Sequence, residues 1–143
     1  MAQSFTATIE NRVAAYRKRM ETTFRASAQD IAEEITTPVA KGGNMRIKTG
    51  FLRASLMAST SMMPSIRPGN VPAPDAADNS FELDDGQINL VIAGANIGDV
   101  IFLGFTAAYA RPREYRDGFV RLAAQNWQQI VNRNAAKAIQ AHP

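Results

Sequence analysis

The sequence predicts one α+β domain over residues 1–143, and three observations lead to that prediction. Apolar residues recur at helical spacing over the first 35 positions and again after residue 117, and short strand-like runs lie between them. With 143 residues, of which 45% are hydrophobic and 20% charged, the chain can bury a substantial core. The order of elements predicts a small antiparallel sheet, with the C-terminal helix packed on it.

The first helix is predicted from residue 5 to residue 35, capped by Ser4 or Thr6. Pro38 ends it, because proline disfavours helical geometry in the residue before it. A straight helix of this length extends about 46 Å, whereas a globule of this chain length is about 37 Å across. We therefore expect the helix to bend or break, or to present part of its apolar stripe to another chain. The stripe consists of Phe5, Ile9, Val13, Tyr16, Met20, Phe24, Ala28, Ile31 and Ile35.

The middle of the chain predicts a loop, a strand and a long arm. Residues 39–50 form a basic loop that contains glycines, and residues 52–60 alternate in polarity as a strand does, with room for a helical turn at their start. Residues 62–86 are rich in proline and aspartate and lack periodicity. We therefore expect this segment to be an extended arm or loop that makes contacts.

The second half of the chain predicts a hairpin followed by a helix. Residues 87–93 alternate in polarity, residues 100–105 form a second apolar run, and turn-forming residues separate the two. Asp117 is the expected N-cap of the last helix, whose apolar spacing continues to Ile139.

The residue types argue against an enzyme and against a cofactor or metal site. The chain has no cysteine, and its only histidine, His142, is next to the last residue, so the usual zinc ligand sets are excluded. The acidic residues between 75 and 85 lack the spacing of a calcium loop, and the glycines between 94 and 98 do not follow the phosphate-binding patterns. Ser55 has no evident base. The longest nearly uncharged apolar stretch, residues 100–110, is too short to span a bilayer.

Charge is separated along the chain. Residues 1–53 carry 9 basic and 5 acidic side chains, residues 54–99 carry 1 and 6, and residues 100–143 carry 6 and 2. Blocks of opposite sign favour complementary contacts between copies or partners, although solvated faces that merely differ in sign would give the same counts. The basic residues also permit non-specific contact with DNA phosphates. The candidate interface residues are Lys41, Arg46, Lys48, Arg67, Asp75, Asp78, Asp84 and Asp85.

Two segments resemble a known family. Residues 49–56, TGFLRASL, resemble the T-G-x-L-R-x-S-L signature of the tail-completion, or neck, proteins of long-tailed lambda-like bacteriophages. Residues 98–101 and 109–121 are similar to the hairpin strand, the Y-A-x-x-x-E-Y-G turn and the last helix of that family. Arg116 stands where the family has glycine, so a positive φ there would be strained.

The resemblance implies an α+β subunit of a closed ring, with six copies, at the joint between head connector and tail tube. The genome would cross the lumen, and the partners would be the adjoining connector (adaptor or stopper) and tail proteins. The ring would assemble in the bacterial cytoplasm and remain in the virion. The alternatives are a tail terminator or stopper of the same stack, or a basic accessory protein that associates with DNA.

The motif residues are expected to fix the fold around the sheet edge. Simple packing would place Leu52, Leu56, Tyr109 and Phe119 in the core and pair Arg53 with Glu114. The motif residues are Thr49, Gly50, Leu52, Arg53, Ser55, Leu56, Tyr109, Ala110, Glu114, Tyr115, Gly118 and Phe119.

Overall fold

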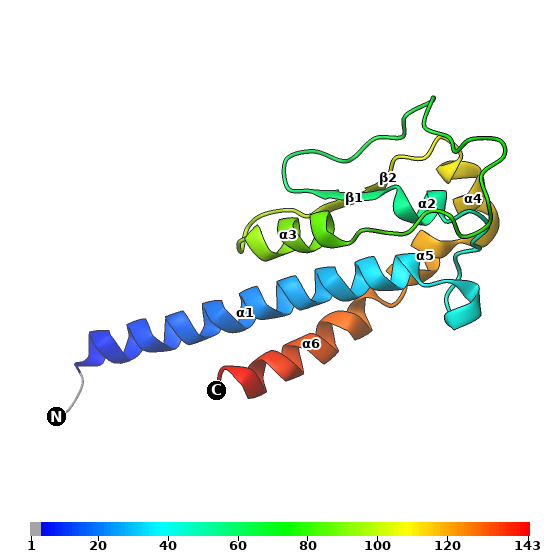
Figure 1. Cartoon of the computed structure of the whole chain (residues 1–143). Coiled ribbons are helices and arrows are strands. Elements are labelled where there is room, and N and C mark those ends of the chain that lie inside the picture. The colour runs from blue at the N-terminus through cyan, green and yellow to red at the C-terminus, as the bar shows by residue number, and fades with distance from the viewer. Residues whose placement is uncertain (1–3) are drawn as a thin grey trace.

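The computed structural model, which describes residues 4–143, confirms an α+β architecture (Figure 1). Two helices, α1 and the C-terminal α6, lie side by side, and a layer of strands and short helices covers the C-terminal half of α1. The elements in chain order are α1 (Phe5–Thr36), the 3-10 turn η1 (Val39–Lys41), α2 (Phe51–Ala54), β1 (Leu56–Ser59), α3 (Gly86–Gly94), β2 (Phe102–Phe105), α4 (Ala110–Asp117), α5 (Phe119–Ala124) and α6 (Trp127–Ala141).

Helix α1 matches its sequence prediction to within one residue. The Ser4 hydroxyl accepts a hydrogen bond from the Ala7 backbone N–H at 3.1 Å, so Ser4 is the N-cap. The helix runs without interruption to Thr36, two residues before Pro38. All 32 residues belong to one unbroken helix of about 48 Å, so the predicted break does not occur.

The predicted hairpin is wrong. Strand β2 pairs antiparallel with β1, in a register that sets Leu56 opposite Phe105, and residues 86–94 form helix α3. Helical spacing buries Ile88 and Ile92 together and leaves Leu90 76% exposed, whereas a strand would have placed all three on one face. A short apolar run permits both structures, and packing against β1 decides between them.

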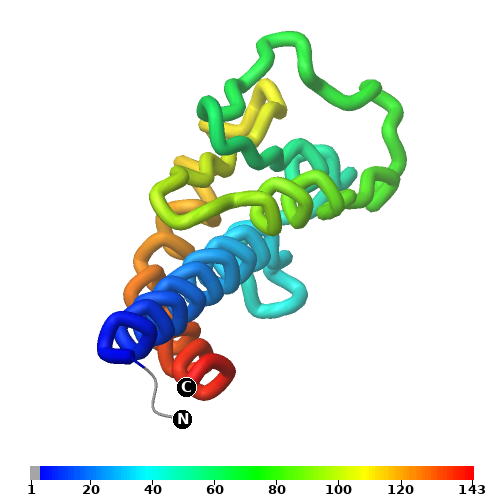
Figure 2. The backbone as a smooth tube through the Cα atoms, turned by 90° about the vertical axis from the view of Figure 1, so that its left-hand side faces the viewer, coloured from blue at the N-terminus to red at the C-terminus, as the bar shows by residue number. Residues whose placement is uncertain are grey.

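Helix α3 also closes the outer edge of the sheet. The Gln87 side chain donates to the Ala58 carbonyl at 2.6 Å and accepts from the Ala58 N–H at 3.0 Å. An amide side chain thus satisfies the backbone groups that a further strand would have used. The arm, from residue 60 to residue 85, contains no helix or strand and runs as a wide loop over the far side of this layer (Figure 2).

The predicted C-terminal helix is divided, and its main part packs on α1 rather than on the sheet. Gly118, at φ 67°, separates α4 from α5, so Asp117 ends a helix instead of capping one. Only α5 reaches the sheet, where Phe119 packs edge-on against Phe105 with ring centres 5.2 Å apart. In α6 the buried residues Ile130, Asn134 and Ala138 recur at i, i+4 and i+8. That stripe faces α1, which offers a longer apolar surface than a sheet of two short strands.

A polar cluster fixes the contact between α1 and α6. Asp30 accepts hydrogen bonds from Arg133 at 2.9 Å and from Asn134 at 3.0 Å, and the Asn134 amide also reaches the Ser27 hydroxyl at 3.3 Å. Burial alone would raise the pKa of Asp30. The hydrogen bonds from Asn134 and Arg133, with the charges of Arg133 and Lys137, outweigh burial and hold that pKa below its ordinary value.

We expect Asp30→Asn to remove an acid-sensitive part of the stability. A lowered pKa contributes stability above the ordinary pKa, and this contribution disappears as pH falls through the folded-state pKa, below about pH 4. At pH 7 the variant should lose about 1 kcal/mol, because two charge-assisted hydrogen bonds weaken at a partly exposed site. Urea unfolding at pH 7 and at about pH 3 measures both effects.

The matched control is Glu33→Gln, an exposed carboxylate on the same helix. Equal acid sensitivity in the wild type and in Asp30→Asn would show that Asp30 does not link the two helices electrostatically.

Candidate functional site

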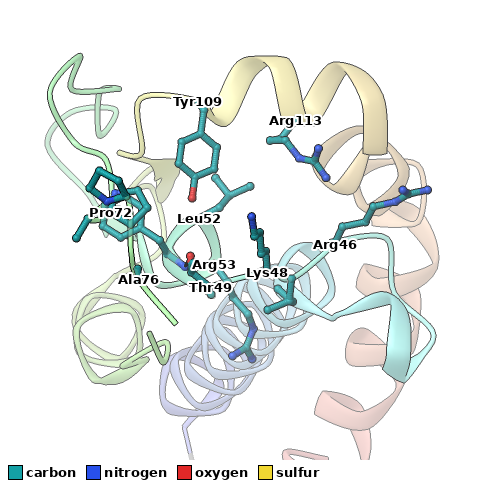
Figure 3. A pocket seen from close by; sticks show the side chains of 14 residues that line it. Arg46, Lys48, Thr49, Leu52, Arg53, Pro72, Ala76, Tyr109 and Arg113 are labelled. Atoms are coloured by element: carbon teal, nitrogen blue, oxygen red, sulfur yellow. Dashed lines mark hydrogen bonds between the residues drawn. The ribbon is translucent and has the colours of Figure 1, made fainter. Parts of the chain in front are cut away.

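The two motif segments meet around a basic pocket of about 420 Å³ (Figure 3). Residues 46–53 form its floor, Tyr109 and Arg113 form one wall, and Pro72, Ala73, Pro74 and Ala76 of the arm form the other. Tyr109 and Phe51 pack with ring centres 6.3 Å apart, which joins the first motif to the second.

The turn at Thr49 and Gly50 attaches the arm to the pocket. Gly50 has φ 85°, and a Cβ there would lie 2.2 Å from the Phe81 carbonyl oxygen, so only glycine fits. The Asn79 N–H donates to the Lys48 carbonyl at 2.8 Å, and the Phe81 N–H donates to the Thr49 carbonyl at 2.9 Å. Phe81 also packs edge-on against Phe51, with ring centres 5.1 Å apart. The arm is therefore fixed to the pocket floor over residues 79–81.

The Tyr109 hydroxyl points into the pocket (Figure 3). Burial raises the pKa of Tyr109, although the Thr49 side chain, the Leu52 backbone and the charge of Arg113 oppose the shift. At neutral pH the side chain is an uncharged phenol, as it also is at the ordinary pKa of tyrosine, and it can donate a hydrogen bond to a ligand.

Four cations come from three segments of the chain. Arg46 and Lys48 belong to the basic loop, Arg53 to α2 and Arg113 to α4. The Asp117 carboxylate lies 3.0 Å from Arg113 and 3.7 Å from Arg46.

The expected ion pair between Arg53 and Glu114 is wrong. The Arg53 Nε donates to the Thr36 carbonyl at 2.8 Å, where it satisfies the C-terminal end of α1. The Glu114 carboxylate instead accepts from the backbone N–H groups of Val120 at 2.8 Å and Arg121 at 3.0 Å, in the first turn of α5. Both side chains satisfy backbone groups at helix ends.

The other motif residues divide into buried and exposed. Leu52, Leu56 and Phe119 are buried and Tyr109 is half-buried, which confirms the packing interpretation. Ala110 and Ser55 are buried too, and the Ser55 hydroxyl donates to the Leu52 carbonyl at 2.7 Å.

The second motif places its unusual backbone at Gly118. Arg116 lies inside α4, and the positive φ occurs two residues later, so Arg116 is not strained. Tyr115, at 88% exposed, contributes nothing to the core.

The candidate interface residues are exposed and do not gather in one place. Within residues 4–143 none of the acidic ones forms an ion pair with a basic one of the set. Lys41 lies outside the basic pocket, and the Arg67 N–H donates to the Thr106 carbonyl at 3.0 Å. The exposed residues of this set are Lys41, Arg46, Lys48, Arg67, Asp75, Asp78, Asp84 and Asp85.

The N-terminal half of α1 forms a second candidate surface. The C-terminal end of α6 reaches α1 only near Arg19 and Thr22, where the His142 carbonyl accepts from Arg19 and the His142 ring lies 3.1 Å from the Thr22 hydroxyl. The N-terminal turns of α1 extend past that point (Figure 1). We call the exposed apolar side chains of this half the free stripe. They are Phe5, Ile9, Val13, Tyr16 and Met20, exposed by 81%, 45%, 49%, 52% and 59%.

An apolar groove of about 680 Å³ continues the free stripe between α1 and α6. Tyr16 and Met20 belong to both features, and Trp127, Val131 and Ile139 of α6 line the opposite side of the groove. Sequence periodicity identified the stripe, but the groove depends on where α6 packs and was not predicted.

We expect Gly50→Ala to destabilise the fold by at least about 2 kcal/mol, because it combines a strained φ with a clash against the Phe81 carbonyl. Gly94→Ala is the control, since its Cβ would meet nothing within 4 Å. Thermal unfolding measures the difference. If the two variants have equal midpoints, the turn does not require glycine.

Comparison of the chain with protein-family models, curated proteins and solved structures finds no match.

Among the described residues, no helix is both long and apolar enough to cross a membrane.

Proposed function

We propose that this chain is a structural subunit of a bacteriophage neck. Copies form a ring, six in number by the motif resemblance, that joins the head connector to the tail tube and lets DNA pass. The adjoining connector and tail proteins are its partners, and the virion is its final location. In this proposal the chain acts through mechanical joining, and no residue has a catalytic role.

The free stripe is the observation that supports this proposal most directly. Five large apolar side chains project along one side of a helix that its own fold does not cover. A contiguous exposed apolar surface of this kind is typical of a protein-binding surface. A head-to-tail contact between copies closes into a ring when its rotation permits.

The exposure of side chains along α1 also supports contact with another chain. The half that α3, α5 and α6 cover buries Ser27, Ala28, Ala32 and Ile35. The uncovered half carries Phe5, Tyr16 and Met20, which only a further partner would shield from water.

Charge supports the choice of a second copy as one such partner. The described acidic residues of the arm form no ion pair within the chain. Opposite charges left unpaired in one copy can be matched between copies.

A DNA-associating accessory protein is the second candidate function, and the basic pocket is the observation that favours it. Such a protein would bind duplex DNA with a steep salt dependence and would not remain in particles. A tail terminator or stopper would instead occupy an adjacent level of the same stack.

We expect the pair Val13→Glu and Met20→Glu to abolish ring assembly and head-to-tail joining, because it places two charges in a surface that would be buried. The isolated subunit should keep its stability within about 0.5 kcal/mol, since both side chains are exposed. Ala14→Glu, on the opposite side of the helix, is the matched control and should assemble.

Imaging of particles, with the subunit labelled, assigns its level in the stack. Native mass measurement should show rings of the wild type in the presence of the tail tube protein, even if the subunit alone is monomeric. Normal joining by the double variant, or absence of the chain from particles, would exclude the proposed function.

A further inference from the structure

The basic pocket carries more positive charge than its own fold neutralises. Arg46, Lys48, Arg53 and Arg113 line it, and none of its lining residues is acidic. Among residues 4–143, Asp117 is the carboxylate that pairs with this group, and it contacts only Arg46 and Arg113. The Lys48 ammonium forms no ion pair within the described chain. The Arg53 side chain is directed to the Thr36 carbonyl at the end of α1 and does not point towards Lys48, Tyr109 and Arg113 (Figure 3). A net positive charge therefore remains available to a ligand.

The donors converge on one space. The Lys48 amine, the Tyr109 hydroxyl and the Arg113 guanidinium point into the pocket from three sides (Figure 3). An ammonium, a guanidinium and a phenol at neutral pH can all donate hydrogen bonds. Convergent donors with excess positive charge match an oxygen anion.

The remaining wall selects for a peptide rather than for duplex DNA. Pro72, Ala73, Pro74 and Ala76 present an apolar edge, and Phe51 lies at the floor. Duplex phosphates lie on the outside of a wide rod and favour exposed ridges, whereas these cations border a recess of about 420 Å³. A recess with one apolar wall and one cationic wall fits a short chain segment that presents several acidic side chains.

We propose that this pocket binds the acidic segment 75–85 of a second copy. That segment carries five acidic residues and no basic residue. Its Phe81 packs on Phe51 of the same chain and its Leu83 packs against the core, so the acidic side chains are what the segment can offer to another copy. Its acidic residues are exposed and form no ion pair within their own chain. The inference rests on the proposed function to the extent that both require contact between copies, and it adds which charges meet in that contact.

The test uses the full chain and a fluorescent peptide with the sequence of residues 75–85. Fluorescence anisotropy should show saturable binding that weakens as salt rises. Lys48→Gln should weaken binding about tenfold, and adding Arg113→Gln should weaken it further. Lys48→Gln is the main variant, because its side chain is exposed and holds no ion pair, so we expect the variant to fold like the wild type.

Two controls isolate the pocket. Lys41→Gln changes a cation of the same loop that lies outside the pocket, and it should bind like the wild type. A peptide with every Asp and Glu replaced by Asn and Gln should not bind. Failure of the acidic peptide to bind, or equal binding by Lys48→Gln, would overturn the proposal.

A duplex DNA fragment provides the remaining arm. If DNA binds through Lys48 and Arg113 and displaces the peptide, the pocket is a phosphate site and the proposal is wrong. If Lys48→Gln with Arg113→Gln still assembles rings and joins heads to tails, the pocket is not the contact between copies, while the proposed function stands. If Val13→Glu with Met20→Glu loses joining while Lys48→Gln with Arg113→Gln keeps it, the proposed function stands and the pocket proposal is wrong.

Discussion

The packing of α6 against α1 is the constraint on which the rest of the structure depends. Ser27, Asp30 and Asn134 form a polar link within this contact, and such a link fixes how far one helix can slide along the other. Because α6 contacts α1 only as far as Arg19, that position decides how much of α1 is left without cover. The extent of this contact between α6 and α1 determines the groove and the free stripe. It also holds α5, which directly precedes α6, under the sheet.

Local patterns predicted part of this fold. The spacing from Phe5 to Ile35 identified α1, because helical periodicity over nine turns has no competing interpretation. Comparing that length with the size of a globule predicted that the helix would bend or break, or would present part of its stripe to another chain, and left open which part. The run from Gln87 to Ala93 failed, since a short apolar segment fits a strand or a helix and its contact with β1, far away in sequence, determines the outcome. The apolar spacing predicted helix up to Ile139, but it predicted neither the division into α5 and α6 nor the packing of α6 on α1.

The basic pocket shows the same division between local and distant information. Lys48 and Arg53 were evident as basic residues near a motif, yet their arrangement with Arg113 depends on α4 folding back against α2. Arg53 was assigned an acidic partner on charge alone, but it satisfies the last carbonyl of α1. No sequence signal separates an arginine that binds a backbone carbonyl from one that binds a carboxylate.

The motif residues mostly serve the backbone. Gly50 and Gly118 adopt positive φ, Arg53 and Ser55 donate to carbonyls, and Glu114 accepts from the first turn of α5. A signature made of such residues specifies how the chain turns, and many assemblies can use the same turns. Of the surfaces proposed to make contacts, the free stripe and Lys48 lie outside the signature, and Arg113 occupies an unspecified position within its second segment. The motif resemblance therefore bears first on architecture, and the proposed role in joining rests on the free stripe and on the unpaired charges.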